Sequence, residues 1–263
     1  MASNSIAGRT ALVTGATGGL GLAIAERLVA EGCHVVITGI VEDSEVAETL
    51  AGISAGPGSI FYHRADLRDV SAIEALMASA QARLGTIDIL VNNAVVRHFS
   101  PVENYPVERW DEALAVNISA PFHLIRLAVP GMRAKGWGRI VNLGSVHSFF
   151  GAPNRVDYIT SKTAIIGMTR GIALEFSGTD ITCNALCPGT LPTPAIASRI
   201  DAIAARKGVS QEEATREYLS DRQPGGRFIS YDAVTSLLVY LCSPEARDVN
   251  GAALPIDAAW TVS

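Results

Sequence analysis

Short apolar runs rich in β-branched residues alternate with longer amphipathic segments along most of the chain. Seven short runs predict buried strands, at Thr10–Thr14, His34–Thr38, Ile60–Ala65, Ile87–Asn92, Arg139–Leu143, Ile181–Leu186 and Ala252–Ile256. The segments between them predict helices at Gly19–Glu31, Glu42–Leu50, Val70–Leu84, Glu108–Lys135, Val156–Phe176 and Tyr231–Leu241. This alternation predicts an α/β fold with a single doubly wound sheet of seven parallel strands.

One segment, about residues 192–226, breaks the alternation. It begins with two prolines, continues through charged helical stretches at Ile196–Arg206 and Gln211–Leu219, and ends in Gln223-Pro-Gly-Gly. It follows the sixth strand, at the carboxyl edge where open α/β sheets bind ligands. We expect a helical lid over a substrate, with a surface or subunit-contact helix pair as the alternative. No linker or repeat divides the chain, so residues 1–263 are expected to form one domain.

Composition narrows the class of protein. With 48% apolar and 18% charged residues the chain can bury a large core, and its 26 acidic against 21 basic residues predict neither a nucleic-acid partner nor a membrane partner. Residues 1–5 show no basic segment followed by an apolar one, so a cytoplasmic protein is expected. The four cysteines lack the spacing of a zinc site, and we expect reduced core thiols and no metal.

A glycine-rich turn follows the first strand and opens the first helix. It reads Thr14-Gly15-Ala16-Thr17-Gly18-Gly19-Leu20-Gly21. Glycines in this position let backbone amides approach a pyrophosphate, whose charge the helix N-terminus stabilises. The turn therefore predicts a Rossmann-type nucleotide site.

The spacing Gly-x3-Gly-x-Gly and several later motifs resemble the short-chain dehydrogenase/reductase family over nearly the whole chain. The later motifs are Asp66-Leu67, Asn92-Asn93-Ala94, Asn117, Ser145, Tyr158-x3-Lys162 and Pro188-Gly189. The resemblance implies a nicotinamide dinucleotide bound by Gly15, Thr17, Gly19, Leu20, Gly21, Asp66, Leu67, Asn93, Ala94, Tyr158, Lys162, Pro188, Gly189 and Thr193. It places Asp66 at the adenine amino group, Asn93 and Ala94 beside the adenosine, and Thr193 at the nicotinamide carboxamide or the phosphates.

The end of the second strand usually selects between the two dinucleotides, because an acid there binds the ribose diol and an arginine accepts the 2′-phosphate. Gly39 stands where the acid often sits, and the following Ile40-Val41-Glu42-Asp43 contains no cation. The glycine turn offers Thr17 and no basic residue. A 2′-phosphate would meet carboxylates and no cation, so we predict NAD.

Interconversion of an alcohol and a ketone by hydride transfer needs a group that moves the hydroxyl proton. Tyr158 and Lys162 lie four residues apart on one predicted helix, and a nearby ammonium is expected to lower the tyrosine pKa from its usual value of ~10. The resemblance adds Ser145 as the donor to the substrate oxygen and Asn117 as the residue that positions a proton-relay water. It also assigns to Lys162 the nicotinamide ribose hydroxyls.

Two departures from the family pattern stand near the cofactor. Val95 replaces the usual glycine after Asn92-Asn93-Ala94, and Ala258-Ala259 replaces a Gly-Gly near the C-terminus. They leave open a dinucleotide-binding regulatory protein with little turnover.

Within the family, the sequence resembles the bacterial (R)-3-hydroxybutyrate dehydrogenases, on Ser145-Val-His147, the lid sequence Gln211-Glu-Glu-Ala-Thr-Arg-Glu and the terminal Trp260-Thr. This implies substrate contacts from Arg97, His98, Ser145, His147, Arg155, Arg199 and Trp260. The subgroup mostly has Gln or Lys where this chain has its three arginines. Because guanidinium groups pair with carboxylates through two hydrogen bonds and stay charged, we expect a small anionic 3-hydroxy acid, bulkier or more charged than 3-hydroxybutyrate.

The remaining alternative is a reductase of neutral 3-oxoacyl, sugar or steroid ketones, against which the arginines argue. The family resemblance also implies a homotetramer. The apolar residues Leu124, Ile125, Leu127, Ile165 and Ile166 fit either a subunit interface or the core.

Overall fold

The computed structural model describes residues 6–53 and 56–263; residues 1–5, on which the expectation of no leader segment rests, lie outside it. The strands are β1 (Thr10–Thr14), β2 (His34–Gly39), β3 (Ser59–Arg64), β4 (Ile89–Asn92), β5 (Gly138–Leu143), β6 (Ile181–Pro188) and β7 (Ala253–Ile256). The helices are α1 (Gly19–Ala30), α2 (Asp43–Ile53), α3 (Val70–Leu84), α4 (Val107–Leu114), α5 (Ala120–Lys135), α6 (Val156–Glu175), α7 (Pro194–Lys207), α8 (Gln211–Ser220) and α9 (Tyr231–Cys242).

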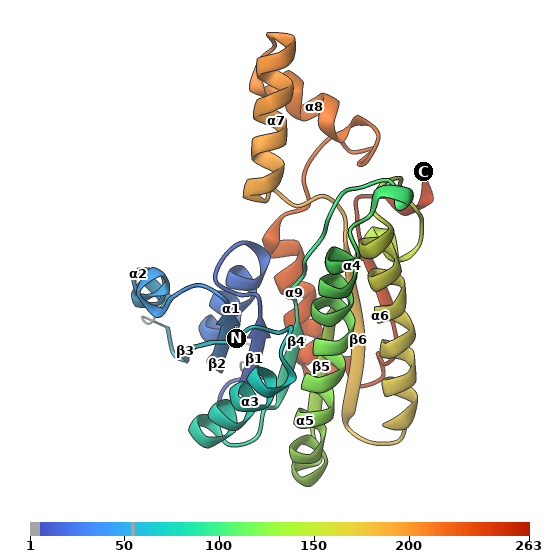
Figure 1. Cartoon of the computed structure of the whole chain (residues 1–263). Helices are drawn as coiled ribbons and strands as arrows, with labels where there is room; N and C mark the ends of the chain where they lie inside the picture. The colour runs from blue at the N-terminus through green and yellow to red at the C-terminus, as the bar shows by residue number, and fades with distance from the viewer. Residues whose placement is uncertain (1–5, 54–55) are drawn as a thin grey trace.

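All seven strands form one parallel sheet in the order β3-β2-β1-β4-β5-β6-β7, which confirms the predicted fold class. The chain builds the sheet outward from β1 to β3 and then returns to place β4 on the other side of β1 (Figure 1). Loops after β1 and β4 therefore diverge at this switch point. A crevice opens there at the carboxyl edge, which is the usual ligand site of open α/β sheets.

Helices cover both faces of the sheet. On one face α1 packs beside α9, and apolar side chains such as Val13, Leu28 and Leu238 form a core under them. On the other face α3 packs beside α5, over a core that includes Leu12, Leu76 and Leu124. Alternate residues of one strand thus serve opposite faces, as the pleat requires.

The predicted helix at Glu108–Lys135 is interrupted in the structure. A π-helical turn, Ala115–Ser119, separates α4 from α5 and contains the buried Asn117. The full span Val107–Lys135 is long and apolar enough to cross a membrane by composition. Its apolar side nevertheless lies against the sheet and α3, so its composition is that of a core helix.

The apolar residues considered for a subunit interface are mostly core residues. Leu124, Ile125, Ile165 and Ile166 are buried within this chain, so they give no support to an interface. All four cysteines are likewise buried and form no disulfide. Burial raises the pKa of the Cys33 thiol to about 12, which keeps it protonated.

The segment between β6 and α9 forms a helical pair that stands above the carboxyl edge of the sheet (Figure 1). α7 and α8 have a small apolar core of their own, built on Ile200, Ala214 and Leu219. Gln223 ties the end of this pair to the body, because its Oε1 accepts a hydrogen bond of 2.6 Å from the Thr190 amide. The predicted helices are present, and closure over a substrate stays a prediction.

Candidate active site

A cavity of about 790 Å³ lies at the carboxyl edge of the sheet, between the body and the lid. The glycine turn lines one end, and Ser145, Tyr158 and Lys162 line the middle. Residues of the lid and Trp260 close the other end. Most of the residues that the sequence assigned to cofactor and substrate meet in this one space.

The glycine turn is held by the strand beyond the switch point. The side chain of Asn93 donates to the carbonyls of Thr14 and Gly15 at 2.8 and 2.9 Å. A Cβ at Gly21 would lie 2.4 Å from the Gly15 carbonyl oxygen, so only glycine fits there. Gly15 and Gly19 adopt positive φ angles of 60° and 56°, which side chains other than glycine's disfavour. The turn is therefore a cradle for a phosphate group at the N-terminus of α1.

A cation that the sequence did not predict lies near the end of β2. Arg64, at the end of β3, donates to the Ile40 carbonyl at 3.0 Å and pairs with Glu42 at 2.9 Å. The prediction that no cation lies near the end of β2 is thus wrong, because β3 brings one from a distant part of the sequence. Its charge is already paired with an acid. At Gly39 a Cβ would lie 2.7 Å from the Thr17 methyl, so a side chain there would require Thr17 to move.

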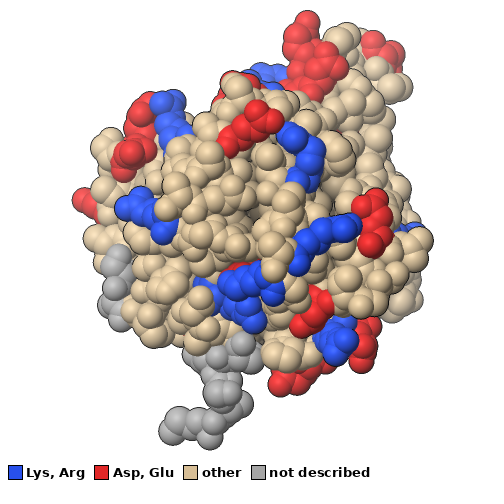
Figure 2. All heavy atoms as spheres, turned by 90° about the horizontal axis from the view of Figure 1, so that it is seen from below, with Lys and Arg blue, Asp and Glu red and all other residues tan. Residues whose placement is uncertain are grey.

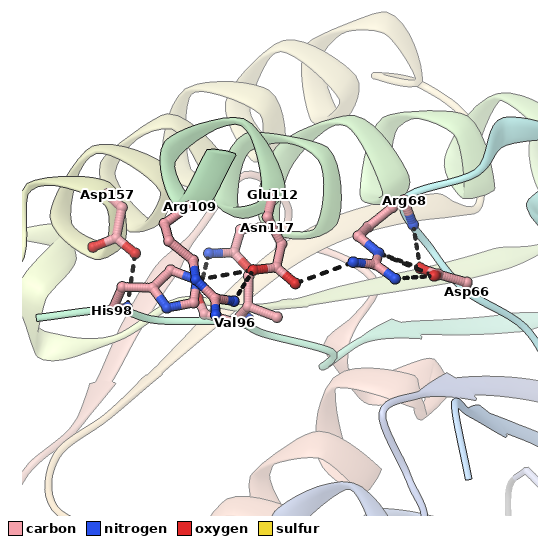
Figure 3. Close-up of polar contacts among 8 residues, drawn as sticks. All are labelled: Asp66, Arg68, Val96, His98, Arg109, Glu112, Asn117 and Asp157. Carbon is pink, nitrogen blue, oxygen red and sulfur yellow. Dashed lines mark hydrogen bonds and ion pairs between the residues drawn. The ribbon is translucent and has the colours of Figure 1, made fainter. Parts of the chain in front are cut away.

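Asp66 also has a partner that the sequence did not reveal. Arg68 binds its carboxylate through Nε and Nη2, at 3.0 and 2.5 Å, and lowers the pKa of that carboxyl group (Figure 3). The Arg68 guanidinium continues to Glu112, which lies on α4. Asp66 lines the cavity, and its carboxylate already accepts hydrogen bonds from Arg68. An adenine amino group would therefore share this carboxylate with Arg68.

Ser145, Tyr158 and Lys162 come together as the motif predicts, at the end of β5 and on the first turns of α6. The Ser145 hydroxyl caps a short turn by accepting from the His147 amide at 3.2 Å. Lys162 is buried, and its Nζ donates to the Leu143 carbonyl at 2.5 Å and lies 5.7 Å from the Tyr158 ring centre. The end of β5 thus fixes both the hydroxyl and the ammonium beside the phenol.

The expected lowering of the Tyr158 pKa by Lys162 is wrong for this state of the protein. Burial raises the pKa of the phenol, and the groups that oppose this rise are the Ser145 hydroxyl and the charges of Arg97 and Arg155. Burial also lowers the pKa of Lys162 to about 8. The helical spacing predicted the proximity of the two side chains, but burial cannot be read from spacing.

The Asn117 side chain is hydrogen-bonded to protein groups, and its role toward a proton-relay water stays a prediction. Its side chain accepts from the Val96 amide at 2.9 Å and donates to the Val96 carbonyl at 2.8 Å (Figure 3). It also donates to Ser161 at 3.2 Å. These bonds fasten the segment after β4 to the helices beside Tyr158. The side chain amide is occupied by protein groups and is a positioning element of the site.

The substrate end is aromatic and basic. Nη1 of Arg155 lies 3.3 Å from Nε2 of His147. Since a guanidinium only donates, Nε2 accepts and the ring proton resides on Nδ1. Burial and the charge of Arg155 lower the His147 pKa, which keeps the imidazole neutral. The ring also packs edge-on against Tyr158 and Trp260 at 6.1 and 5.8 Å.

The last turn holds Trp260 in place through strained alanines. Ala258 and Ala259 take the left-handed region, with φ of 51° and 71°, where the family pattern has glycine. The carboxylate of Asp257 accepts from the amides of Ala259 and Thr261 at 3.2 and 2.7 Å. These bonds hold the turn that places Trp260 on the cavity wall. The other departure, Val95, also lines the cavity and is 43% exposed.

Of the other predicted substrate residues, Arg97 and Arg199 line the cavity and His98 does not. Nε2 of His98 faces Glu112 at 3.1 Å, and its amide donates to Asp157 at 3.0 Å (Figure 3). The assignment of His98 to substrate is therefore wrong, because α4 and α6 capture both polar ends of the residue. Its neighbour Arg97 lines the cavity.

Among the cavity residues that the sequence did not predict are Tyr218 and Arg222, at the substrate end. Arg222 donates to the Tyr218 carbonyl at 2.5 Å, and its guanidinium lies 4.4 Å from the centre of the Tyr218 ring. Tyr218 lies in the last turn of α8, where a charged helical stretch gives no signal of which residues face inward. Arg222 lies in the turn that follows α8, and both residues line the cavity.

The described residues fit a nicotinamide dinucleotide on two grounds. The absence of a side chain at Gly21 lets the start of α1 pack directly against the Gly15 carbonyl and Asn93. Among the described residues, none beyond its chain neighbours has an atom within 4 Å of where a Cβ at Gly18 would stand, so the turn has space beside its backbone for a phosphate. At the start of α7, the buried hydroxyl of Thr193 faces the cavity without a hydrogen-bond partner among the described residues. Pro188 and Gly189 line the wall between these two points.

Comparison with known proteins agrees with this geometry. The family model for short chain dehydrogenases matches residues 9–203. D-beta-hydroxybutyrate dehydrogenase of Cupriavidus necator is 40% identical over 257 residues, covering 96% of this chain and 98% of that protein. 2-(R)-hydroxypropyl-CoM dehydrogenase of Xanthobacter autotrophicus is 34% identical with the same coverage.

Among solved structures, L-sorbose reductase of Gluconobacter frateurii, complexed with NADPH and L-sorbose, superposes with a TM-score of 0.94. It is 26% identical, and the match covers 99% of each chain. The sequence motifs, the sheet topology and the cavity have the same explanation: the chain belongs to the short-chain dehydrogenase family, whose members are oxidoreductases.

Proposed function

We propose that the protein is an NAD-dependent oxidoreductase that interconverts a small anionic 3-hydroxy acid and its oxo acid. The observation that carries the proposal is the juxtaposition, in one cavity, of Ser145 and Tyr158 with arginines that have no acidic partner. The relatives named as D-beta-hydroxybutyrate dehydrogenases, which cover nearly the whole chain, support the same substrate class.

The chain's own residues would handle the proton and the acid group. The Ser145 hydroxyl donates to the substrate oxygen, and the Tyr158 phenol exchanges the proton with it. Arg155, held by His147, binds the acid group, and Lys162 holds ribose hydroxyls at the floor of the site. Bound NAD supplies the hydride acceptor or donor. Because the buried phenol has a raised pKa, rising pH favours alcohol oxidation, which needs the phenolate.

The preference for NAD rests on the pairing of the nearby cations. Arg64 is engaged by Glu42, and Arg68 by Asp66, so a 2′-phosphate would have to displace a carboxylate to gain either. Two structural relatives are complexed with NADPH, so the fold by itself does not select NAD. Direct comparison of the two cofactors is therefore part of the test.

The experiment is a spectrophotometric screen of NAD and NADP against hydroxy acids and neutral alcohols, on the wild type and Arg155→Gln. We expect NADH formation with hydroxy acids, and a rise in KM of about tenfold or more in the variant, since one charge-assisted pair is lost. The affinity for NAD should stay unchanged. Turnover of sugars or other neutral alcohols alone would select the neutral-carbonyl reductase, and dinucleotide binding without turnover would select a regulatory protein.

A further inference from the structure

Four arginines surround the substrate end of the cavity without an acidic partner. Arg97 and Arg155 belong to the body, and Arg199 and Arg222 belong to the lid. Among the described residues, none of the four forms an ion pair. The acids that line the cavity, Asp66 and Glu112, are already paired with Arg68.

Positive charge is rarely left uncompensated in a partly buried place. On the face seen from below, basic and acidic side chains are interspersed (Figure 2). The cavity differs because its cations come from both sides of the gap between body and lid.

An aromatic ring brings a cation of the body and one of the lid together. The guanidinium of Arg155 lies 5.0 Å from the centre of the Phe99 ring, and that of Arg199 lies 4.7 Å from the same centre. The ring stabilises each charge, but the two charges repel each other. The pKa of Arg155 is lowered by burial and by the charges of Arg199, Arg222 and Arg97, which places all four in one electrostatic cluster.

A substrate with one negative charge would offset only one of the four positive charges, whereas a substrate with two would offset one on the body and one on the lid. We propose that the cavity selects hydroxy acids with two negative charges, one acidic group bound by Arg97 and Arg155 and the other by Arg199 and Arg222. Such a dianion bridges body and lid and holds α7 and α8 over the reacting carbon. This inference rests on the proposed function for the identity of the reacting alcohol and assigns the charge of the rest of the substrate.

Binding of unreactive acids tests the charge requirement without chemistry. Glutarate and pentanoate have the same five-carbon chain and differ by one carboxylate. Calorimetry on the NAD-saturated protein at constant ionic strength should show glutarate binding about tenfold more tightly or better. In Arg199→Gln the ratio of the two affinities should fall toward one. Arg206→Gln, which changes an exposed arginine of the same helix outside the cavity, should keep the wild-type ratio.

Lid closure has its own readout. Glutarate should slow hydrogen exchange in α7 and α8, and pentanoate should not. Among reactive acids, malate and 3-hydroxybutyrate differ only by a carboxylate in place of a methyl group, and 3-hydroxyglutarate extends that group by one carbon. We expect kcat/KM for the better of the two dianions to exceed that for 3-hydroxybutyrate about tenfold.

Equal affinities for glutarate and pentanoate, or an unchanged ratio in Arg199→Gln, would overturn the inference. So would a higher kcat/KM for 3-hydroxybutyrate than for both dianions. Failure of every hydroxy acid to produce NADH would contradict the proposed function instead, and the glutarate-to-pentanoate ratio would still decide whether the cavity selects a dianion.

Discussion

Single residues decide the protonation chemistry of the site. The sequence identifies Tyr158 and Lys162 by their spacing together with Ser145 and the family resemblance, and their proximity follows from one helical turn. Their pKa shifts follow from burial, which depends on the whole fold and cannot be predicted from a local sequence pattern. The sequence places Arg155 near Tyr158 because the two are three residues apart, but it does not place Arg222, whose direction depends on the turn after α8.

The buried Lys162 makes stability depend on pH in a definite direction. Its pKa is about 8 in the folded protein, below the ordinary value of 10.5. Between these values the unfolded chain binds more protons, so folding stability rises as the pH increases from about 8 to 10.5. Below about pH 8 Lys162 is charged in both states, and burying its ammonium lowers the free energy of unfolding by on the order of 3 kcal/mol.

Lys162→Met removes this cost. We expect the variant's free energy of unfolding to improve relative to wild type by up to roughly 3 kcal/mol more at pH 7 than at pH 10.5. Urea denaturation of both proteins without cofactor at the two pH values measures the difference. The same change at the exposed Lys207 is the control. A difference between variant and wild type that does not vary with pH would show that Lys162 is not desolvated.

At the scale of elements, the lid and the divided helix position the chemistry. The π turn at Ala115–Ser119 could not be predicted from the sequence, because the apolar pattern of the predicted helix Glu108–Lys135 continues through these residues. The π turn contains Asn117, whose side chain forms two hydrogen bonds with the backbone of Val96. The lid was predicted from its break in the strand and helix alternation, and its separate core was not.

That separate core predicts local unfolding. Leu219 is fully buried between α7 and α8, and truncating a buried leucine to alanine typically costs 2–5 kcal/mol. In Leu219→Ala we expect faster hydrogen exchange in Pro194–Lys207 and Gln211–Ser220, with the exchange of β1 and β4 unchanged. Leu174→Ala, at a position 75% exposed on α6, is the control. Loss of protection throughout the sheet would show instead that lid and body unfold together.

At the scale of the whole molecule, the alternation of strands and helices predicted the seven-stranded sheet because parallel strands and their crossovers leave few other arrangements. The switch point between β1 and β4 then places the glycine turn, Asn93 and the end of β5 around one cavity. The cations near the cofactor could not be predicted in this way, since Arg64 reaches Ile40 only through the pairing of β2 with β3. The pairing of β2 with β3 thus brings Arg64 to the end of β2, and the lid contributes Arg199 and Arg222 to the substrate end.

The central claim is that the phenol of Tyr158 moves the proton while a bound dinucleotide exchanges hydride with the substrate carbon. The most direct measurement is NADH formation by Tyr158→Phe in the presence of a hydroxy acid that the wild type oxidises, together with NAD affinity measured by calorimetry. Loss of a general acid–base group should lower kcat by about 10²–10⁴-fold, with NAD affinity within about threefold of wild type. A variant that keeps the wild-type kcat, or a wild-type protein that binds neither NAD nor NADP, would contradict this account.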